Sequence, residues 1–100
     1  MNISYSKSFI KSASKLTGKY KFSLKKKIEE VKSASKVDEL TDCKKLKGFE
    51  HTYRTRIGDY RVFFVFNLEN DMVFFEYLVK RDVAYDKKYL KALGKTKTVY

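Results

Sequence analysis

Apolar residues in the first third of the chain recur at helical spacing after one short strand. Residues 2–5, with the sequence NISY, are typical of a strand, and Ser6 is suited to cap a helix that follows directly. The apolar side chains of this helix recur every three or four residues, and Gly18 is expected to end it. They are Phe9, Ile10, Ala13 and Leu16.

A second helix is predicted over residues 20–34, with one apolar face and one face rich in lysine. The apolar face consists of Tyr20, Leu24, Ile28 and Val31. The run Lys25–Lys27 falls largely on the other side, where two of the lysines precede Glu29 and Glu30 by four residues. Such pairs are typical of a solvated helix face, so the lysine run is interpreted as surface.

From Thr52 onward the period of the apolar positions changes to two, which is the period of strands. Strands are predicted over 52–57, 60–67 and 72–80. The dipeptide Gly58-Asp59 and the segment 68–71 join them, which makes an antiparallel meander. The last two strands are apolar at most positions, so both of their faces are expected to be covered, one of them by the two helices.

The segments between and after these elements complete the expected fold. Residues 35–51 are predicted to form a polar connection in which Leu40 and Leu46 tuck under the loop. A short helix is predicted over about 86–93. The expected fold is therefore α+β in a single domain spanning residues 1–100: an N-terminal strand, a helical hairpin, an antiparallel β-meander and a short C-terminal helix.

The charge of the chain favours polyanionic partners. Its 23 Lys and Arg residues against 12 Asp and Glu residues give a formal net charge of +11. Nucleic acid, an acidic protein and a membrane surface are all compatible with this balance. No apolar run approaches the ~20 residues of a membrane span, and the N-terminal residues lack the apolar stretch of a signal peptide, so a cytoplasmic protein without a membrane partner is expected.

The single cysteine, Cys43, predicts neither a disulfide nor a metal site, because no cluster of His and Cys surrounds it. No cofactor is expected either. A nucleophile pair of Cys43 with His51, the only histidine, is conceivable, but the segment TDCKKLKGFEH has no nucleophile signature. A cysteine between Leu40 and Leu46 is more typical of a small buried apolar residue.

Three arginines gather at the predicted hairpin YRTRIGDYRVFF. Strand alternation places Arg54 and Arg56 on one face, and Arg61 lies just across the turn. A third strand paired antiparallel with the second brings its last residues, Lys80 and Arg81, back beside Arg61. Guanidinium groups are permanently charged and bind phosphate through a planar fork, so this surface is typical of one that grips a phosphodiester.

A purely structural alternative stays open on composition alone. The arginines of the hairpin would then pair with Glu50, Asp59 and Asp82 on an ordinary polar face. Both interpretations use the same residues, and the charge balance does not separate them. The order of the sequence motifs along the chain is the observation that separates them.

The stretch KKLKGFEHTYRTRIGDYRVFFVF, followed after one strand by YLVKRDVAY, resembles the RelE/ParE family, the toxin halves of bacterial type II toxin–antitoxin pairs. The resemblance covers nearly the whole chain and implies the β-α-α-β-β-β fold of that family. RelE-like members are ribosome-dependent endoribonucleases that cut messenger RNA without metal, by attack of a ribose 2′-OH on the adjacent phosphate. ParE-like members instead poison DNA gyrase with the same scaffold.

The resemblance also implies roles for individual residues, carried over position by position. The expected catalytic residues are Arg61, Arg81 and Tyr85. The expected RNA-binding residues, which contact phosphate, are Arg54, Arg56, Lys45, Lys47 and Lys80.

The identity of the general base stays open. Arg54 and Arg56 stand where well-studied RelE-like members have lysine, and an arginine does not lose its proton in a protein. Tyr85 could serve if nearby guanidiniums lower its pKa from about 10. Its ring could equally stack on a splayed base, or pack at the end of the sheet. The other titratable candidates are Lys45, Lys47 and Lys80.

Retention of both Arg81 and Tyr85 beyond the last strand favours the RelE-like branch over a ParE-like gyrase inhibitor. A binding module without catalysis on the same scaffold is the third possibility. The expected partners are mRNA on the ribosome and a cognate antitoxin, since an acidic or amphipathic segment laid over the basic surface would exclude RNA. The chain shows no obvious DNA-reading helix, so sequence-specific DNA binding is expected only through the antitoxin.

Overall fold

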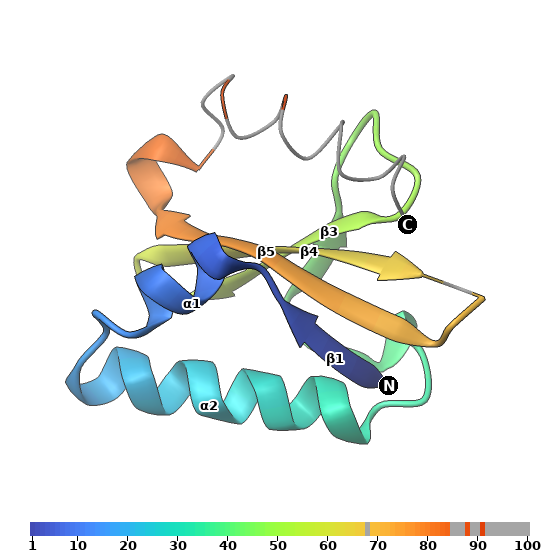
Figure 1. The fold of residues 1–100 in the computed structure, drawn as a ribbon, viewed down its shortest axis with the longest axis horizontal. Coiled ribbons are helices and arrows are strands. Elements are labelled where there is room, and N and C mark those ends of the chain that lie inside the picture. Colours follow the sequence, from blue (N-terminus) through green and yellow to red (C-terminus); the bar gives the residue numbers. More distant parts are fainter. Residues whose placement is uncertain (68, 85–87, 89–90, 92–100) are drawn as a thin grey trace.

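The computed structural model describes residues 1–67, 69–84, 88 and 91, and these form a five-stranded sheet with two helices on one of its faces (Figure 1). Along the chain the strands and helices are β1 (Asn2–Tyr5), α1 (Lys7–Ala13), α2 (Gly18–Ser33), β2 (Cys43–Lys45), β3 (Thr52–Ile57), β4 (Tyr60–Asn67) and β5 (Met72–Lys80). Two short 3-10 helices, η1 and η2, span Val37–Glu39 and Arg81–Val83. The predicted α+β class is confirmed.

The order of strands in the sheet is β1-β5-β4-β3-β2. Strand β1 lies parallel to β5, and the other neighbours pair antiparallel. The predicted bounds of β3, β4 and β5 agree with the structure, and the meander is confirmed. At the β3–β4 turn, Gly58 adopts a φ of +55°, a left-handed conformation that glycine reaches without steric cost.

The connection predicted over residues 35–51 is more structured than its sequence indicated. It contains η1 and the extra strand β2, which pairs with β3 and places Lys44 opposite Arg54. Three residues, two of them lysines, carry no apolar periodicity, so this strand is defined by its hydrogen bonds to β3 alone. The sheet therefore has one strand more than the predicted β-α-α-β-β-β order.

The predicted end of the first helix at Gly18 was wrong. Helix α1 ends at Ala13, and Gly18 begins α2 with a φ of +57° rather than closing the first helix. The hydroxyl of Ser14 donates to the Lys11 carbonyl at 2.7 Å, a local bond of the kind that competes with helix continuation. The predicted N-cap is confirmed, since the Ser6 hydroxyl accepts from the backbone N–H of Phe9 at 2.9 Å.

The lysine run of α2 is only partly solvated. Lys25 and Lys26 are exposed, but the side chain of Lys27 is 12% exposed and lies 3.0 Å from a Glu30 carboxylate oxygen. Lys27 Nζ also donates to the carbonyl of Thr41 at 2.8 Å. The bond to Thr41 therefore ties the segment before β2 to α2, and the Lys27–Glu30 pair stands in place of the solvated pairs that the four-residue spacing predicted.

Both faces of the central strands are covered, as predicted. The larger apolar cluster lies between the helices and the sheet and includes Leu24, Val31 and Phe64. A smaller cluster on the opposite face contains Phe63 and Ala84, with Leu46, Phe49, Tyr77 and Val79 packed against them. The predicted helix over about 86–93 lies outside the described residues apart from 88 and 91. No helix in the described part of the chain is long and apolar enough to cross a membrane.

Candidate phosphate-binding site

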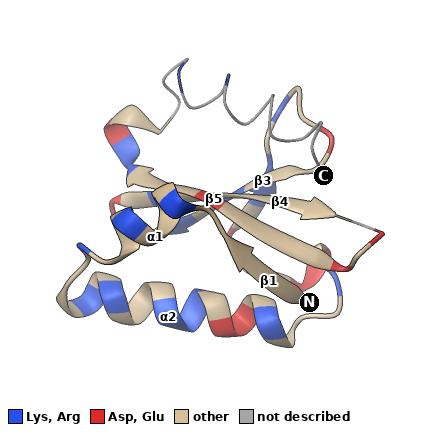
Figure 2. Cartoon of the chain, viewed as in Figure 1, with Lys and Arg blue, Asp and Glu red and all other residues tan. Residues whose placement is uncertain are grey.

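Arg54, Arg56 and Arg61 share the sheet face that points away from the helices, and we call these three residues the arginine face. Arg56 and Arg61 are direct cross-strand partners in the β3–β4 ladder. Residues that alternate with them, Thr55 and Ile57, are buried on the other side. Strand alternation therefore placed Arg54 and Arg56 correctly, and the register of the ladder adds Arg61 to their face. Figure 2 shows basic segments on β3 as well as along both helices.

Arg61 is held over the β3–β4 turn by backbone oxygens. Its Nη1 donates to the carbonyls of Gly58 and Tyr60, each at 3.0 Å. The residue is only 9% exposed, so these bonds form in a partly desolvated place where they orient the guanidinium well. A cation fixed in this way is preorganised, which is the property that electrostatic stabilisation of a developing charge requires.

Asp42 is the carboxylate nearest to the other two arginines, hydrogen-bonded to Arg56 and in a longer ion pair with Arg54. Arg56 donates from Nε at 3.0 Å and from Nη2 at 2.9 Å to the same Asp42 oxygen, and Arg54 Nη1 lies 4.0 Å from that oxygen. The hydrogen bond from Arg56 is the main reason that the pKa of Asp42 is lowered. Sequence reasoning missed Asp42 because its position depends on the pairing of β2, and considered Glu50, Asp59 and Asp82 instead.

Arg54 carries unused hydrogen-bonding capacity. Its side chain is 12% exposed, and its Nη1 is buried with no hydrogen-bond partner among the described residues. A buried donor without an acceptor is costly, by about 1–3 kcal/mol. Arg54 lies on the same face as Arg56 and Arg61, so its charge adds to theirs.

Arg81 flanks the same turn from the end of β5. Its backbone N–H donates to the carbonyl of Asp59 at 2.8 Å, which continues the β4–β5 ladder by one more pair. Lys80 is the cross-strand partner of Tyr60 and therefore lies on the helix side of the sheet. A cavity of about 440 Å³ opens here, lined by Tyr20, Asp59, Tyr60, Lys80, Arg81 and Asp82. Arg61 and Arg81 therefore meet at one turn, as expected, whereas Lys80 lies on the other side of the sheet.

The remaining predicted site residues lie in different places. Lys45 is opposite Tyr53, on the helix side, whereas its neighbour Lys44 lies opposite Arg54 on the arginine face and was missed. Lys47 is exposed in the loop after β2. Tyr85 lies outside the described residues, so its proposed role stays a prediction.

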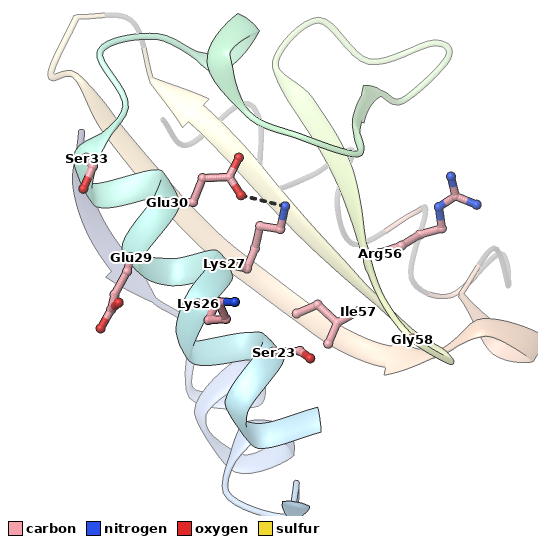
Figure 3. A pocket seen from close by; sticks show the side chains of 9 residues that line it. All are labelled: Ser23, Lys26, Lys27, Glu29, Glu30, Ser33, Arg56, Ile57 and Gly58. Atoms are coloured by element: carbon pink, nitrogen blue, oxygen red, sulfur yellow. Dashed lines mark hydrogen bonds and ion pairs between the residues drawn. The ribbon is translucent and has the colours of Figure 1, made fainter. Parts of the chain in front are cut away.

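A second groove, of about 570 Å³, lies between α2 and the end of β3 (Figure 3). It is lined by Ser23, Lys26, Lys27, Glu29, Glu30, Ser33, Arg56, Ile57 and Gly58. In Figure 3 the Lys27 ammonium points toward Glu30, while the Arg56 guanidinium points away from the helix. Two carboxylates, Glu29 and Glu30, stand among the cations of this groove, against one, Asp42, on the arginine face, so the groove is less suited to a polyanion.

Cysteine and metal chemistry receive no support from the geometry. Burial raises the pKa of Cys43 to about 11, so its thiol stays protonated near neutral pH and is a poor nucleophile. Within the described part of the chain, no three His, Cys, Asp or Glu residues are grouped in a way that could hold a metal ion.

Comparison with known proteins identifies the family. No family model matches the chain. Toxin RelE3 of Methanocaldococcus jannaschii is 31% identical to it over 87 residues, which cover 86% of this chain and 97% of that toxin. The chain belongs to the RelE family of toxins. The resemblance based on the arginine hairpin is thereby confirmed.

Solved structures agree with this RelE assignment. A chain of the RelB-RelE antitoxin-toxin complex from Methanococcus jannaschii matches with a TM-score of 0.71 and 29% identity, covering 83% of this chain and 95% of that one. The archaeal RelE-RelB complex from Pyrococcus horikoshii OT3 matches with a TM-score of 0.69 at 24% identity, over 83% of this chain and 97% of that one. The second likeness supports the fold alone.

Proposed function

We propose that this RelE-family toxin is a ribosome-dependent mRNA endoribonuclease of the cytoplasm. The observation that carries the proposal is the fixed guanidinium of Arg61, anchored on the turn carbonyls beside Arg54 and Arg56. Cleavage of a phosphodiester by the neighbouring 2′-OH passes through a phosphorane with extra negative charge. Cations that are already oriented lower that barrier without reorganising during the reaction.

Each basic residue has a distinct task in this scheme. Arg54 and Arg56 bind phosphate oxygens and hold the RNA backbone in line for attack. Arg61 stabilises the phosphorane, and Arg81, which flanks the same turn, stabilises the charge on the departing 5′-oxygen. Since arginine cannot accept the 2′-OH proton, a titratable group must do so, and Tyr85 is the first candidate. The alternatives are Lys45, Lys47 and Lys80.

The test compares two targets with one protein preparation. Purified toxin is incubated with mRNA-programmed ribosomes, with the same mRNA alone, and separately with gyrase and supercoiled DNA. The proposal predicts new mRNA ends only on ribosomes, with a 5′-hydroxyl on the downstream product. Cleaved DNA trapped on gyrase, with intact mRNA, would mean that the protein acts as a gyrase poison instead.

We also propose that a cognate antitoxin inhibits the toxin by covering the arginine face. Two of the structural relatives are complexes of RelE with RelB. A net charge of +11 favours an acidic or amphipathic partner segment, and steric cover requires no signal through the fold.

Coexpression with the neighbouring reading frame and hydrogen exchange of the copurified complex test this prediction. Protection is expected at residues 54–61. Protection confined to α1 and α2 would show that inhibition acts at a distance, and steric cover would then be abandoned.

A further inference from the structure

The β3–β4 turn is attached to helix α2 by Tyr20, in the first turn of that helix. The Tyr20 hydroxyl donates to Asp59 Oδ2 at 3.1 Å. The Tyr20 ring also packs edge-on against Tyr60, with 5.1 Å between the ring centroids. The hydrogen bond to Asp59 is the largest cause of the raised pKa of Tyr20, so the hydroxyl stays protonated and able to donate at neutral pH.

Gly58 permits this close approach. A Cβ atom at position 58 would lie 2.6 Å from Tyr20 Cε1, a distance at which atoms must move apart. The ring therefore occupies the space that a side chain at the turn would fill. Three successive residues of the turn, Gly58, Asp59 and Tyr60, thus contact one tyrosine.

The same three residues hold both arginines that flank the turn. The carbonyls of Gly58 and Tyr60 accept from Arg61 Nη1, and the carbonyl of Asp59 accepts from the Arg81 N–H. Any rotation of the turn relative to the sheet would redirect the Arg61 guanidinium and displace the backbone of Arg81. What fixes the turn therefore fixes the phosphate-binding geometry.

We propose that Tyr20 is a positioning residue, which acts through the β3–β4 turn to hold the Arg61 guanidinium and the backbone of Arg81 in place. This inference rests on the proposed ribonuclease function. Tyr20 has no contact with RNA in this account. Its effect belongs to the cleavage step, since a misdirected guanidinium still attracts phosphate but stabilises the phosphorane less.

Single-turnover cleavage on saturating ribosomes tests the positioning role with Tyr20→Phe and Tyr20→Ala. Tyr20→Phe keeps the ring contacts and removes the hydroxyl, and Tyr53→Phe, in β3, is the matched control. We expect Tyr20→Ala to slow cleavage on the order of 10-fold, less than the ~10²-fold that a 1 Å misplacement can cost. Tyr20→Phe should lie between Tyr20→Ala and the unchanged Tyr53→Phe.

The toxin concentration that half-saturates the ribosomes separates positioning from binding and from mere stability. It should stay unchanged in the folded variants while the rate falls. A wild-type rate in folded Tyr20→Ala would overturn the inference, and so would a loss explained entirely by weaker ribosome binding. Adding Asp59→Ala to Tyr20→Phe should cost little more than the worse single change, because both remove the same hydrogen bond between Tyr20 and Asp59.

Hydrogen exchange in the free protein provides a readout that does not depend on cleavage. The Arg81 amide, which donates to Asp59, should exchange several-fold faster in Tyr20→Ala, while amides in the middle of β5 keep their wild-type rates. An unchanged exchange rate of the Arg81 amide would contradict the proposal that Tyr20 holds the turn. If Tyr20 is shown to hold the turn but the wild-type toxin leaves mRNA intact on ribosomes, the proposed function fails, and the positioning role of Tyr20 in cleavage fails with it.

Discussion

Arg61 is at once permanently charged and nearly buried. Such a position is costly for a cation unless hydrogen bonds replace its hydration, and the carbonyls of Gly58 and Tyr60 do this. Arg56 is more exposed and instead relies on a carboxylate, Asp42. The two neighbours on the arginine face are therefore oriented by different means, one by backbone dipoles and the other by an ion pair.

The ion pair predicts a defined titration of Asp42. Its pKa is lowered in the folded protein, so its contribution to stability is present above the unfolded value of about 3.9 and is lost as the pH falls through the folded value. Arg56→Ala should raise the pKa of Asp42 toward that ordinary value and flatten the acid limb of the stability curve. Carboxyl-carbon NMR titration measures this directly, and an unchanged pKa would contradict the assigned partner.

Cys43 provides a second prediction at the residue scale. With a pKa of about 11 its thiolate fraction at pH 7.5 is lower than that of a free thiol by on the order of 10²-fold, and alkylation by iodoacetamide should slow accordingly. The denatured protein is the control for intrinsic reactivity. Rapid alkylation of the native protein, or loss of cleavage in a folded Cys43→Ala variant, would revive the nucleophile hypothesis.

At the scale of elements, the β3–β4 turn is expected to be intolerant of any side chain at Gly58. Gly18 has nearly the same φ, +57° against +55°, but open space around it. Gly18→Ala should therefore lower the free energy of unfolding only by the cost of a left-handed backbone at a residue with a side chain, about 1–2 kcal/mol. Gly58→Ala should cost more in urea unfolding, because Tyr20 must also move.

A Tyr20→Ala background isolates the steric part of that cost. Without the ring, Gly58→Ala should destabilise the protein about as much as Gly18→Ala does. Equal costs for the two glycine substitutions in the wild-type background would show that the contact with Tyr20 yields easily.

The elements that the sequence predicted well are those with their own local signals. Strands β3, β4 and β5 have alternating or continuous apolar positions bounded by polar or glycine-containing turns, and their bounds were predictable. Strand β2 has no such signal, because it exists through pairing with β3. Asp42 and Lys44 were missed for that reason. Gly18 was misassigned because glycine suits both the end of one helix and the start of the next.

For the candidate site, the sequence predicted where the residues lie but not how their side chains are oriented. Alternation alone placed Arg54 and Arg56 on one face, and the pairing of β3 with β4 shows that Arg61 shares it. The direction of each guanidinium was not predictable, since it depends on turn carbonyls and on a carboxylate distant in the ladder. Tyr20 was assigned only to the apolar face of its helix, and its contact with Asp59, 39 residues away, required the packed structure.

At the scale of the whole molecule, positive charge lies on both sides of the sheet. Lysines line α1 and α2, and the arginines occupy the opposite face (Figure 2). The distributed charge draws the toxin to any polyanion, in a manner that salt weakens. Oriented guanidiniums are concentrated at the β3–β4 turn, so the proposed function assigns general attraction and specific chemistry to different parts of the fold.

The central claim is that the arginine face cuts mRNA on the ribosome. Its most direct test is the single-turnover cleavage rate on saturating programmed ribosomes for wild type, Arg61→Ala and Lys25→Ala, an exposed lysine of α2. Arg61→Ala should remain folded and ribosome-bound yet cleave on the order of 10²–10³-fold more slowly, whereas Lys25→Ala should match wild type. A wild-type rate from folded Arg61→Ala, or no cleavage by the wild-type toxin, would contradict the account.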